Sequence, residues 1–478
     1  MQDIKKRLVF LYILCYTEYD FLLYYNTFLR KSKGCDKNML LPKNVVYVIN
    51  TLNKAGYEAF VVGGAVRDYI MGLEPHDYDI TTSAFPDEVK SLFPNYFPLG
   101  EKFGTVSVIV GDEQIEVTTF RSESDYEDGR HPNKVEFVRS LEKDLKRRDF
   151  TMNAIAYNPN TGFVDPFNGI SDIKDKIIRC VNDANERFKE DGLRIVRAVR
   201  FSAKFGFSIE QNTLIAAKNN IDMLDKVSKE RIGSEFAKIL MSDNCEEAIN
   251  NNDFLFDKII PQWKNVRNCQ QNSEWHIYDV KLHTLKVLSS IKNTERLRLA
   301  AFFHDFGKPY VKEIDENGIS HFPGHADKSS EIAEEVLKDL RFSSKEIKEI
   351  SLLIKYHDSF WNPSKKLAKR LLNIFGDKLF LDLIELRRAD ISAQKERPDN
   401  SVSEMLMFYD IIKKDNSAIS IKDLKINGLD VMKTLQIKPS PKVGEILSSL
   451  LSMVIDEEIE NEREILLEKT KEIQKELG

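Results

Sequence analysis

The hydrophobic and polar positions of the chain follow one pattern up to about residue 170 and another beyond it. Between residues 58 and 170, short runs rich in Val, Ile, Phe and Thr alternate with turn residues and helical stretches, which predicts mixed strands and helices. After Asp172 the strand signal fades, and Leu, Ile and Ala recur at spacings of three and four, which predicts helices. The pattern therefore predicts an α+β protein with an all-helical second part.

The first 38 residues form a separate segment. Their "KKRLVFLYILCY" is apolar like the start of a signal peptide, but no small-residue cleavage site follows and charged residues return at once. Met39 precedes an amphipathic pattern, a glycine and a strand-like run, which is typical of the start of a domain. We therefore expect residues 1–38 to be an extension of doubtful function.

Composition argues against a membrane protein and against a disulfide framework. No run of about 18 uncharged apolar residues exists to cross a bilayer. The five cysteines are widely spaced and lack a CxxC motif, which favours a reducing, cytoplasmic location. The net charge of −6 does not indicate a polyanionic partner. Residues 139–204, however, hold 14 Lys and Arg against 10 Asp and Glu, so a local basic face that binds a polyanion is not excluded.

The stretch "VVGGAVRD" places two glycines between a predicted strand and a predicted helix. The strand over 58–62 ends at Gly63 and Gly64, and the helix begins near Ala65, so bare backbone N–H groups can face an anion. Arg67 would add guanidinium donors for the same anion. A pair of glycines before a helix is weak evidence alone, so the phosphate site depends on the residues that follow.

Two aspartates separated by one residue follow in "HDYDIT". Side chains alternate along a strand, so we expect Asp77 and Asp79 to point the same way, and Tyr78 and Ile80 to point toward the core. Neighbouring carboxylates repel unless a divalent cation such as Mg²⁺ neutralises them. Glu116, on a later strand, is a candidate third carboxylate of a two-metal site. The alternative is that all three are ordinary solvated carboxylates.

These motifs occur together in an order that resembles a known enzyme family. The chain holds, in sequence, "GGAVRD", "DYD", "EVTTFR", "GRHPNKVEFV", "LKRRDFTMNAIAYNP" and "EDGLRIVRAVRFSAKFGF". Over about residues 39–460 it is similar to the class II nucleotidyltransferases that add CCA to tRNA 3′ ends, a family that also contains bacterial poly(A) polymerases. The resemblance implies a polymerase-β-type head with a small mixed sheet, followed by helical parts. The implied parts are a nucleotidyltransferase head (39–170), a neck that binds bases and RNA (171–235), a body (236–400) and a tail (401–478).

Polar residues at intervals of three indicate how bases could be chosen without a template. Asp191, Arg194, Arg197 and Arg200 are expected on one helix. Cytosine and adenine present an amino donor beside a ring-nitrogen acceptor, whereas uracil and guanine present a carbonyl and an N–H, so an Asp with an Arg can select C and A. The resemblance assigns this role to Asp191 and Arg194, and it places Arg197, Arg200 and Arg148 along the triphosphate or the primer end. The alternative is a basic helix surface with one ion pair.

A second set of residues resembles another kind of site. Six of the eight histidines lie between His276 and His357. Four of these histidines, with two aspartates, resemble the ligands of HD-domain metal phosphohydrolases, which are fused to this nucleotidyltransferase in some bacterial relatives. His and Asp together suit Mn, Fe, Ni or Co as well as Mg, so the metal is left open, and a metal-free remnant is the alternative. The implied ligands are His283, His304, Asp305, His325, His357 and Asp390.

The sequence thus predicts a cytoplasmic CCA tRNA nucleotidyltransferase, a monomer or a homodimer, that uses CTP, ATP and Mg²⁺ and releases pyrophosphate. The polar segment 122–134 is interpreted as the mobile loop that in this family is needed for the final A. Two alternatives stay open. One is a poly(A) polymerase on the same scaffold, and the other is a metal phosphohydrolase that acts on RNA ends.

Overall fold

A computed structural model describes residues 39–97, 103–124, 134–272, 277–359, 362–395 and 399–477. The extension 1–38 and most of the expected loop 122–134 lie outside these residues. The chain divides into two compact units, Met1–Arg231 and Ile232–Gly478. The finer division into head, neck, body and tail stays a prediction.

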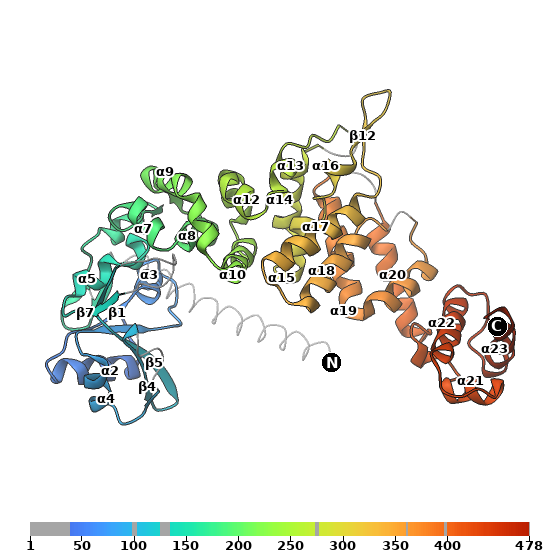
Figure 1. The fold of residues 1–478 in the computed structure, drawn as a ribbon, viewed down its shortest axis with the longest axis horizontal. Helices are drawn as coiled ribbons and strands as arrows, with labels where there is room; N and C mark the ends of the chain where they lie inside the picture. Colours follow the sequence, from blue (N-terminus) through green and yellow to red (C-terminus); the bar gives the residue numbers. More distant parts are fainter. Residues whose placement is uncertain are drawn as a thin grey trace, which may run out of the picture. The chain divides into compact units, whose positions relative to one another are not determined.

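The first unit combines a seven-stranded sheet with short helices (Figure 1). Its elements are α2 (Lys43–Lys54), β1 (Ala59–Val62), α3 (Gly64–Ile70), β2 (Asp79–Thr82), α4 (Pro86–Leu92), β3 (Tyr96–Phe97), β4 (Thr105–Val110), β5 (Glu113–Thr119), β6 (Arg121–Ser124), β7 (Lys134–Phe137), α5 (Leu141–Lys146), η2 (Thr151–Asn153), β8 (Ala156–Asn158), β9 (Gly162–Val164), α6 (Gly169–Lys174), β10 (Ile177–Ile178), α7 (Ala184–Glu190), α8 (Leu193–Phe205), β11 (Ser208–Ile209), α9 (Gln211–Asn219) and η3 (Ile221–Lys226). Helix α10 (Lys229–Leu240) leads into the second unit.

The sheet is mixed, which confirms the predicted α+β class. Its strand order is β3-β4-β5-β2-β1-β8-β9, and within it only β2 and β5 run parallel. The register pairs Val62 of β1 with Asp79 of β2, and Ile80 of β2 with Val117 of β5. Because neighbours in register share a face, this places Asp79 beside Glu116 of β5 at the edge of the sheet where β1 ends.

Apolar residues at helical and strand spacing build the core of the first unit. All four residues of β1 are buried, as a central strand covered on both faces requires. The amphipathic pattern after Met39 forms α2, and its apolar side contacts β1 and α4. The buried residues of α2 are Val45, Val48, Ile49 and Leu52.

In the described part of the second unit, helices are joined by loops, and the strands are the two-residue β12 (Glu313–Ile314) and β13 (Ser320–His321), which local periodicity did not predict. Its helices are α11 (Cys245–Asn251), α12 (Asp253–Ile259), α13 (Trp263–Arg267), α14 (Val280–Ser290), α15 (Glu295–Phe303), α16 (Lys308–Val311), α17 (His325–Asp339), α18 (Ser344–Tyr356), α19 (Lys365–Ser392), α20 (Ser401–Lys414), η4 (Ile421–Asp423), α21 (Gly428–Leu435), α22 (Pro441–Ile455) and α23 (Arg463–Leu477). Among the described residues, no helix combines the length and the apolar character that crossing a membrane requires.

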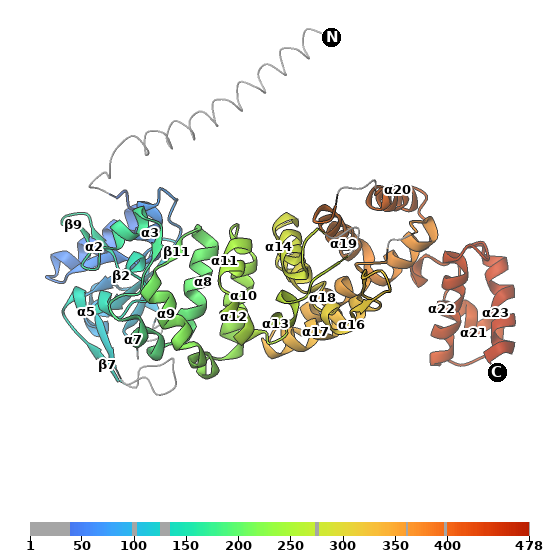
Figure 2. The ribbon, with the colours of Figure 1, turned by 90° about the horizontal axis from the view of Figure 1, so that it is seen from above.

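The last three helices pack around one apolar cluster. Helices α21, α22 and α23 lie side by side in both views (Figure 1, Figure 2). Leu466 and Ile473 of α23 are buried in this cluster together with Ile446 and Leu450 of α22. The charged C-terminal sequence is therefore not simply a solvated helix, because one face of it is part of a core.

Candidate active site

The turn after β1 requires glycine and lies beside an arginine. Gly63 has φ +70°, in the left-handed region that side chains rarely adopt. A Cβ atom on Gly63 would lie 3.0 Å from Nη1 of Arg148. The turn therefore leaves room for the Arg148 guanidinium directly against the backbone, at the place where the sequence predicted an anion site.

The two aspartates predicted to be catalytic lie where β2 begins, and the position of Asp77 differs from the expected one. Strand β2 starts at Asp79, so Asp77 precedes the strand instead of lying on it. The reason is that the ladder to β1 ends at the pair Val62 and Asp79, after which Gly63 turns the partner chain away. The sequence predicted that Tyr78 points toward the core. This prediction is wrong, because Tyr78 is half-buried and lines a cleft.

The electrostatics of Asp79 favour a bound cation. Loss of solvent around its carboxylate and the charge of Glu116 raise the pKa of Asp79; Arg148 opposes this and Asp77 adds to it. Carboxylates whose mutual repulsion is incompletely balanced suit a hard divalent ion such as Mg²⁺. Among the described residues, however, the sets of three metal-type ligand atoms within 4.8 Å of one another all lie in the second unit. The three carboxylates of the first unit share an edge and a cleft without converging that closely.

That cleft has a volume of about 560 Å³, which is within the usual range for a ligand site. It opens at the start of β2 and β5 and reaches the first turn of α2. Its lining residues are Pro42, Val45, His76, Asp77, Tyr78, Asp79, Glu113, Gln114, Ile115 and Glu116.

Asp144 holds the side chain of Arg148 in place. The sequence did not indicate this buried aspartate as a site residue. Asp144 on α5 is fully buried, and its carboxylate accepts hydrogen bonds from Arg147 at 2.9 Å and from Arg148 at 3.4 Å. The Thr81 hydroxyl of β2 also donates to Asp144, at 3.4 Å. Asp144 therefore ties Arg148 to the strand that carries Asp79. An acid three and four residues before two arginines was the available signal, but that spacing is equally typical of surface ion pairs.

A second network connects Arg67 to the helix α8. Arg67 donates from Nη1 to Asn153 Oδ1 at 2.7 Å, and Asn153 donates to Asp149 Oδ1 at 3.0 Å. Arg197 donates from Nη2 to the other oxygen of Asp149 at 2.7 Å. Burial alone would raise the pKa of Asp149, but Arg197, Asn153 and Arg194 lower it to about 2. Arg67 is thus buried and paired with Asn153 and with Asp68, so part of its predicted donor set is used inside the protein.

Three of the arginines that the sequence indicated as candidate ligands lie around the aromatic ring of Phe201. The guanidinium carbon of Arg200 lies 3.9 Å from the centroid of the Phe201 ring, and those of Arg197 and Arg67 lie 5.3 Å and 5.4 Å from it. A ring face stabilises such cations and fixes their planes. The structure therefore brings Arg67 together with Arg197 and Arg200, and the roles that the sequence indicated for these arginines stay predictions.

Asp191 does not lie on the same helix as Arg194, Arg197 and Arg200, contrary to what the sequence had led us to expect. Helix α8 begins at Leu193, so Asp191 lies before the helix and accepts from the Leu193 backbone N–H at 3.0 Å. A short acidic side chain that bonds two residues ahead favours this turn over a further helical residue. The other Asp191 oxygen pairs with Arg231 at 2.8 Å. Arg194 donates to the carbonyl oxygens of Arg187 and Arg147, at 3.1 Å and 2.9 Å.

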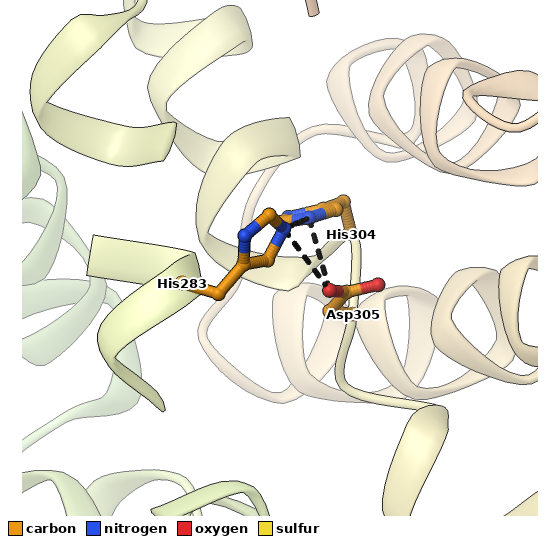
Figure 3. A group of neighbouring side chains, drawn as sticks. All are labelled: His283, His304 and Asp305. Carbon is orange, nitrogen blue, oxygen red and sulfur yellow. Dashed lines mark hydrogen bonds and ion pairs between the residues drawn. The ribbon is translucent and has the colours of Figure 1, made fainter. Parts of the chain in front are cut away.

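In the second unit, all six predicted ligands of the second site converge. They come from α14, from the ends of α15 and α18, from the start of α17, and from α19. His283 Nε2 lies 3.3 Å from His304 Nε2 and 3.4 Å from Asp305 Oδ2 (Figure 3). It also lies 3.0 Å from Asp390 Oδ1. The remaining pair lies on the other side of Asp305, where His325 Nε2 is 3.6 Å from Asp305 Oδ1 and 3.4 Å from His357 Nε2.

Backbone carbonyls fix three of these histidines in one tautomer. Nδ1 of His304, His325 and His357 lies 2.8, 2.9 and 2.6 Å from the carbonyl oxygen three residues earlier, so Nδ1 carries the proton. Their Nε2 atoms therefore point into the cluster. Burial and the neighbouring His325 and His304 lower the pKa of His357 to about 3, so it is neutral. Ring nitrogens only 3.3–3.4 Å apart need a proton or a cation between them, and together with the two carboxylates this donor set fits a metal ion.

Two buried cationic side chains balance the charges of Asp305 and Asp390. The sequence did not indicate them as site residues. Lys308 Nζ lies 2.7 Å from Asp305 Oδ2 and donates to Gln271 Oε1 at 2.8 Å. Arg387 pairs with Asp390 Oδ2 at 3.0 Å. Each carboxylate of the cluster thus already has one positive partner, so a bound metal would give the site a net positive charge that favours an anion.

Three family models match the chain. Residues 59–179 match "Poly A polymerase head domain", residues 206–264 match the "RNA and SrmB- binding site of polymerase A", and residues 315–470 match "tRNA nucleotidyltransferase domain 2". The first match contains the glycine turn and the three carboxylates predicted to bind Mg²⁺, which are Asp77, Asp79 and Glu116.

Curated relatives and solved structures cover most of the chain. A CCA-adding enzyme of Streptococcus pneumoniae (strain CGSP14) is 34% identical over 88% of this chain and 94% of its own length. One of Ligilactobacillus salivarius (strain UCC118) is 32% identical over 90% of this chain and 96% of its own. The crystal structure of the Bacillus stearothermophilus CCA-adding enzyme in complex with CTP is similar with a TM-score of 0.68 and 28% identity, covering 91% of this chain and 98% of that one.

Proposed function

The chain belongs to the family of CCA-adding enzymes, and on this premise we propose that it adds C, C and A to the 3′ end of tRNA without a template, from CTP and ATP. The observation that carries the proposal is the order of groups at one edge of the sheet. Asp79 lies between the Gly63 turn with Arg148 on one side and Glu116 on the other. We place the reaction in the cytoplasm, where the buried free thiols of Cys180, Cys245 and Cys269 would stay reduced.

In the proposed reaction, the 3′ oxygen of the tRNA attacks the α-phosphorus of the nucleotide. A new P–O bond forms, the bond to the β-phosphate oxygen breaks, and pyrophosphate leaves with that electron pair. Mg²⁺ held by Asp77, Asp79 and Glu116 would supply charge stabilisation for both oxygens. The Gly63 and Gly64 turn, with the fork of Arg148 against it, would hold the triphosphate.

The family resemblance supports Asp191 and Arg194 as the pair that reads the base. In the proposed complex, Asp191 accepts from the amino group of C or A and exchanges its contact with Arg231 for that bond. Arg194 is held rigidly by two carbonyl oxygens, which fixes its direction before the base arrives. Arg197 and Arg200, on the ring of Phe201, would bind the triphosphate or the primer end.

The test is incorporation of each labelled nucleotide, one at a time, into tRNA that ends before CCA. We expect CTP alone to be added twice, ATP to be added after two C residues, and UTP and GTP to be rejected. A poly(A) polymerase on this scaffold would add many A residues to the same RNA and no C. An enzyme that incorporates no nucleotide would exclude both forms of the proposal.

We propose a second activity for the histidine and aspartate cluster of the second unit. The convergence of six ligands from five helical segments supports a fused HD domain that binds Mn, Fe, Ni, Co or Mg. Such an ion would supply an activated water, and the protein groups would hold a phosphate ester in place beside it. The substrate class that fits the proposed first activity is a phosphate on a damaged tRNA 3′ end, which would block addition.

This second proposal is tested with a separation-of-function variant. His304→Ala with Asp305→Ala should abolish metal binding, measured by elemental analysis, and metal-dependent hydrolysis, while CCA addition continues. His321→Ala is the matched control, because this exposed histidine pairs with Asp315 on the β12–β13 hairpin outside the cluster. If the unmodified protein contains no metal and hydrolyses no phosphorylated tRNA end with Mn²⁺, Ni²⁺ or Co²⁺, the cluster is a structural remnant.

A further inference from the structure

The catalytic cleft continues around the edge of the sheet, away from the anion turn. Along β5, Gln114 and Glu116 lie on the face of Asp79, whereas Glu113 and Ile115 lie on the opposite face, where α2 packs. Residues of both faces line the same cleft. The cleft therefore begins at the catalytic carboxylates and passes around the ends of β2 and β5 to the first turn of α2.

The far part of the cleft is built from groups that suit a nucleoside better than a phosphate. Its apolar wall consists of Pro42, Val45 and Ile115, and its polar groups include the Glu113 carboxylate and the Tyr78 phenol. Glu113 is fixed by the side-chain amide of Asn44 in α2, which donates to Glu113 Oε2 at 2.8 Å and leaves the other carboxylate oxygen for a ligand. None of the described lining residues is a lysine or an arginine.

The order of strands sets which substrate this part of the cleft can take. β2 has β1 on one side and β5 on the other. The Gly63 turn and Arg148, which suit the triphosphate, lie on the β1 side of Asp79. In phosphoryl transfer the attacking and leaving oxygens are roughly in line on opposite sides of the phosphorus. The attacking 3′ oxygen must therefore approach from the β5 side, where the cleft lies.

We propose that the cleft from Asp77 to Asn44 binds the 3′-terminal nucleoside of the acceptor RNA, and that Glu113 reads its ribose 2′-hydroxyl. This inference rests on the proposed function and names the acceptor subsite of the same centre. The carboxylate of Glu113 accepts a hydrogen bond from the 2′-hydroxyl, as carboxylates do in charge-assisted hydrogen bonds. Pro42, the half-buried residue of the apolar wall, contacts the sugar, and His76 and Tyr78 lie beside the base. The enzyme thereby distinguishes an RNA end from a DNA end.

The test combines a protein change with a substrate change. The acceptors are two tRNA transcripts that end before CCA and differ only in a ribose or a 2′-deoxyribose at the last nucleotide, both with a free 3′-hydroxyl. For the unmodified protein, loss of the 2′-hydroxyl should raise the acceptor KM about tenfold, as for a lost hydrogen bond to a charged group. Glu113→Ala should raise the KM for the ribose acceptor by a similar factor, have little further effect on the deoxy acceptor, and leave the KM for CTP unchanged.

Controls make every outcome decisive. Glu142→Ala removes an exposed glutamate on α5, outside the cleft, and should change neither acceptor KM. If Glu113→Ala lowers the melting temperature, Glu113→Gln keeps an acceptor for Asn44 and should still reduce the ribose preference. An unchanged ratio of the two acceptor KM values in both Glu113 variants would overturn this inference. An unmodified protein that incorporates no CMP would instead overturn the proposed function itself.

Discussion

At the scale of single residues, the account depends on what surrounds Asp79. Its carboxylate has a raised pKa because it loses solvent and lies near Glu116, and Arg148, whose charge opposes this, is itself held by buried Asp144. The same cation lies against the glycine turn. A charge-neutralising metal and a triphosphate would therefore be brought to one point by residues that already constrain each other.

The first prediction concerns the catalytic carboxylates. Asp79→Ala or Asp77→Ala should lower nucleotide addition by about two orders of magnitude or more and leave tRNA affinity nearly unchanged, because the metal ligands are lost while the binding surface remains. Single-turnover kinetics and filter binding measure the two effects. Asp87→Ala removes an exposed aspartate of α4 and should leave both unchanged. Substantial turnover in both active-site variants would refute the assignment.

The second prediction concerns base selection by Asp191. Asp191→Asn keeps an oxygen for the Leu193 N–H but turns the other oxygen, which accepts, into an amide that donates. The ratio of CTP to UTP incorporation should fall about tenfold or more, because the amino group of cytosine loses its acceptor and the carbonyl of uracil gains a donor. A ratio equal to that of the unmodified enzyme would show that the base is read elsewhere.

The third prediction concerns stability and pH at Asp149. Its pKa falls from the ordinary 3.8 to about 2 on folding, so the charged form stabilises the fold above pH 4 and this contribution is lost as pH falls through 2. Asp149→Asn should therefore lower the free energy of unfolding by about 2 kcal/mol at pH 7, and by about half as much at pH 3. Urea unfolding at both pH values checks this, with exposed Asp112→Asn as the control. A destabilisation that does not change with pH would contradict the ion pair.

At the scale of elements, local pattern located the strands and helices but not their ends. Strand β1, the glycine turn, β5 and α2 lie where period and turn residues predicted them. Asp77 and Asp191 fell two residues outside their expected elements because long-range pairing with β1 and a side-chain bond to Leu193 set those ends. In the sequence, an acidic residue such as Asp144 cannot be told from a surface residue. Its role in holding Arg148 becomes evident only from its burial in the folded protein.

The fourth prediction concerns the start of the folded head. A chain that begins at Met39 should fold and add CCA as the full chain does, because the described cleft begins at Pro42 and the buried core at Met39. A chain that begins after Asn44 should lose the partner of Glu113 and bind acceptor RNA more weakly. The acceptor KM and the melting temperature of both chains give the answer. An insoluble or inactive protein from Met39 would show that residues 1–38 take part in the core or in RNA binding.

At the scale of the whole molecule, each of the two units carries its own candidate chemistry. The carboxylates of the first unit come from one sheet edge within about 40 residues, so the sequence could indicate them. The ligands of the second unit span more than 100 residues and five helices or helix ends, and no local pattern can show that they meet. Only the resemblance to a known ligand set predicted that convergence, and the geometry of His283, His304 and Asp305 agrees with it.

The most direct test of the central claim is to sequence the 3′ ends of tRNA transcripts that lack CCA after reaction with all four nucleotides and Mg²⁺. The account predicts that nearly every extended end of the unmodified protein reads CCA and stops there, and that Asp79→Ala leaves the ends unextended. Ends that carry A tracts, that carry U or G, or that are extended equally well by Asp79→Ala would contradict it.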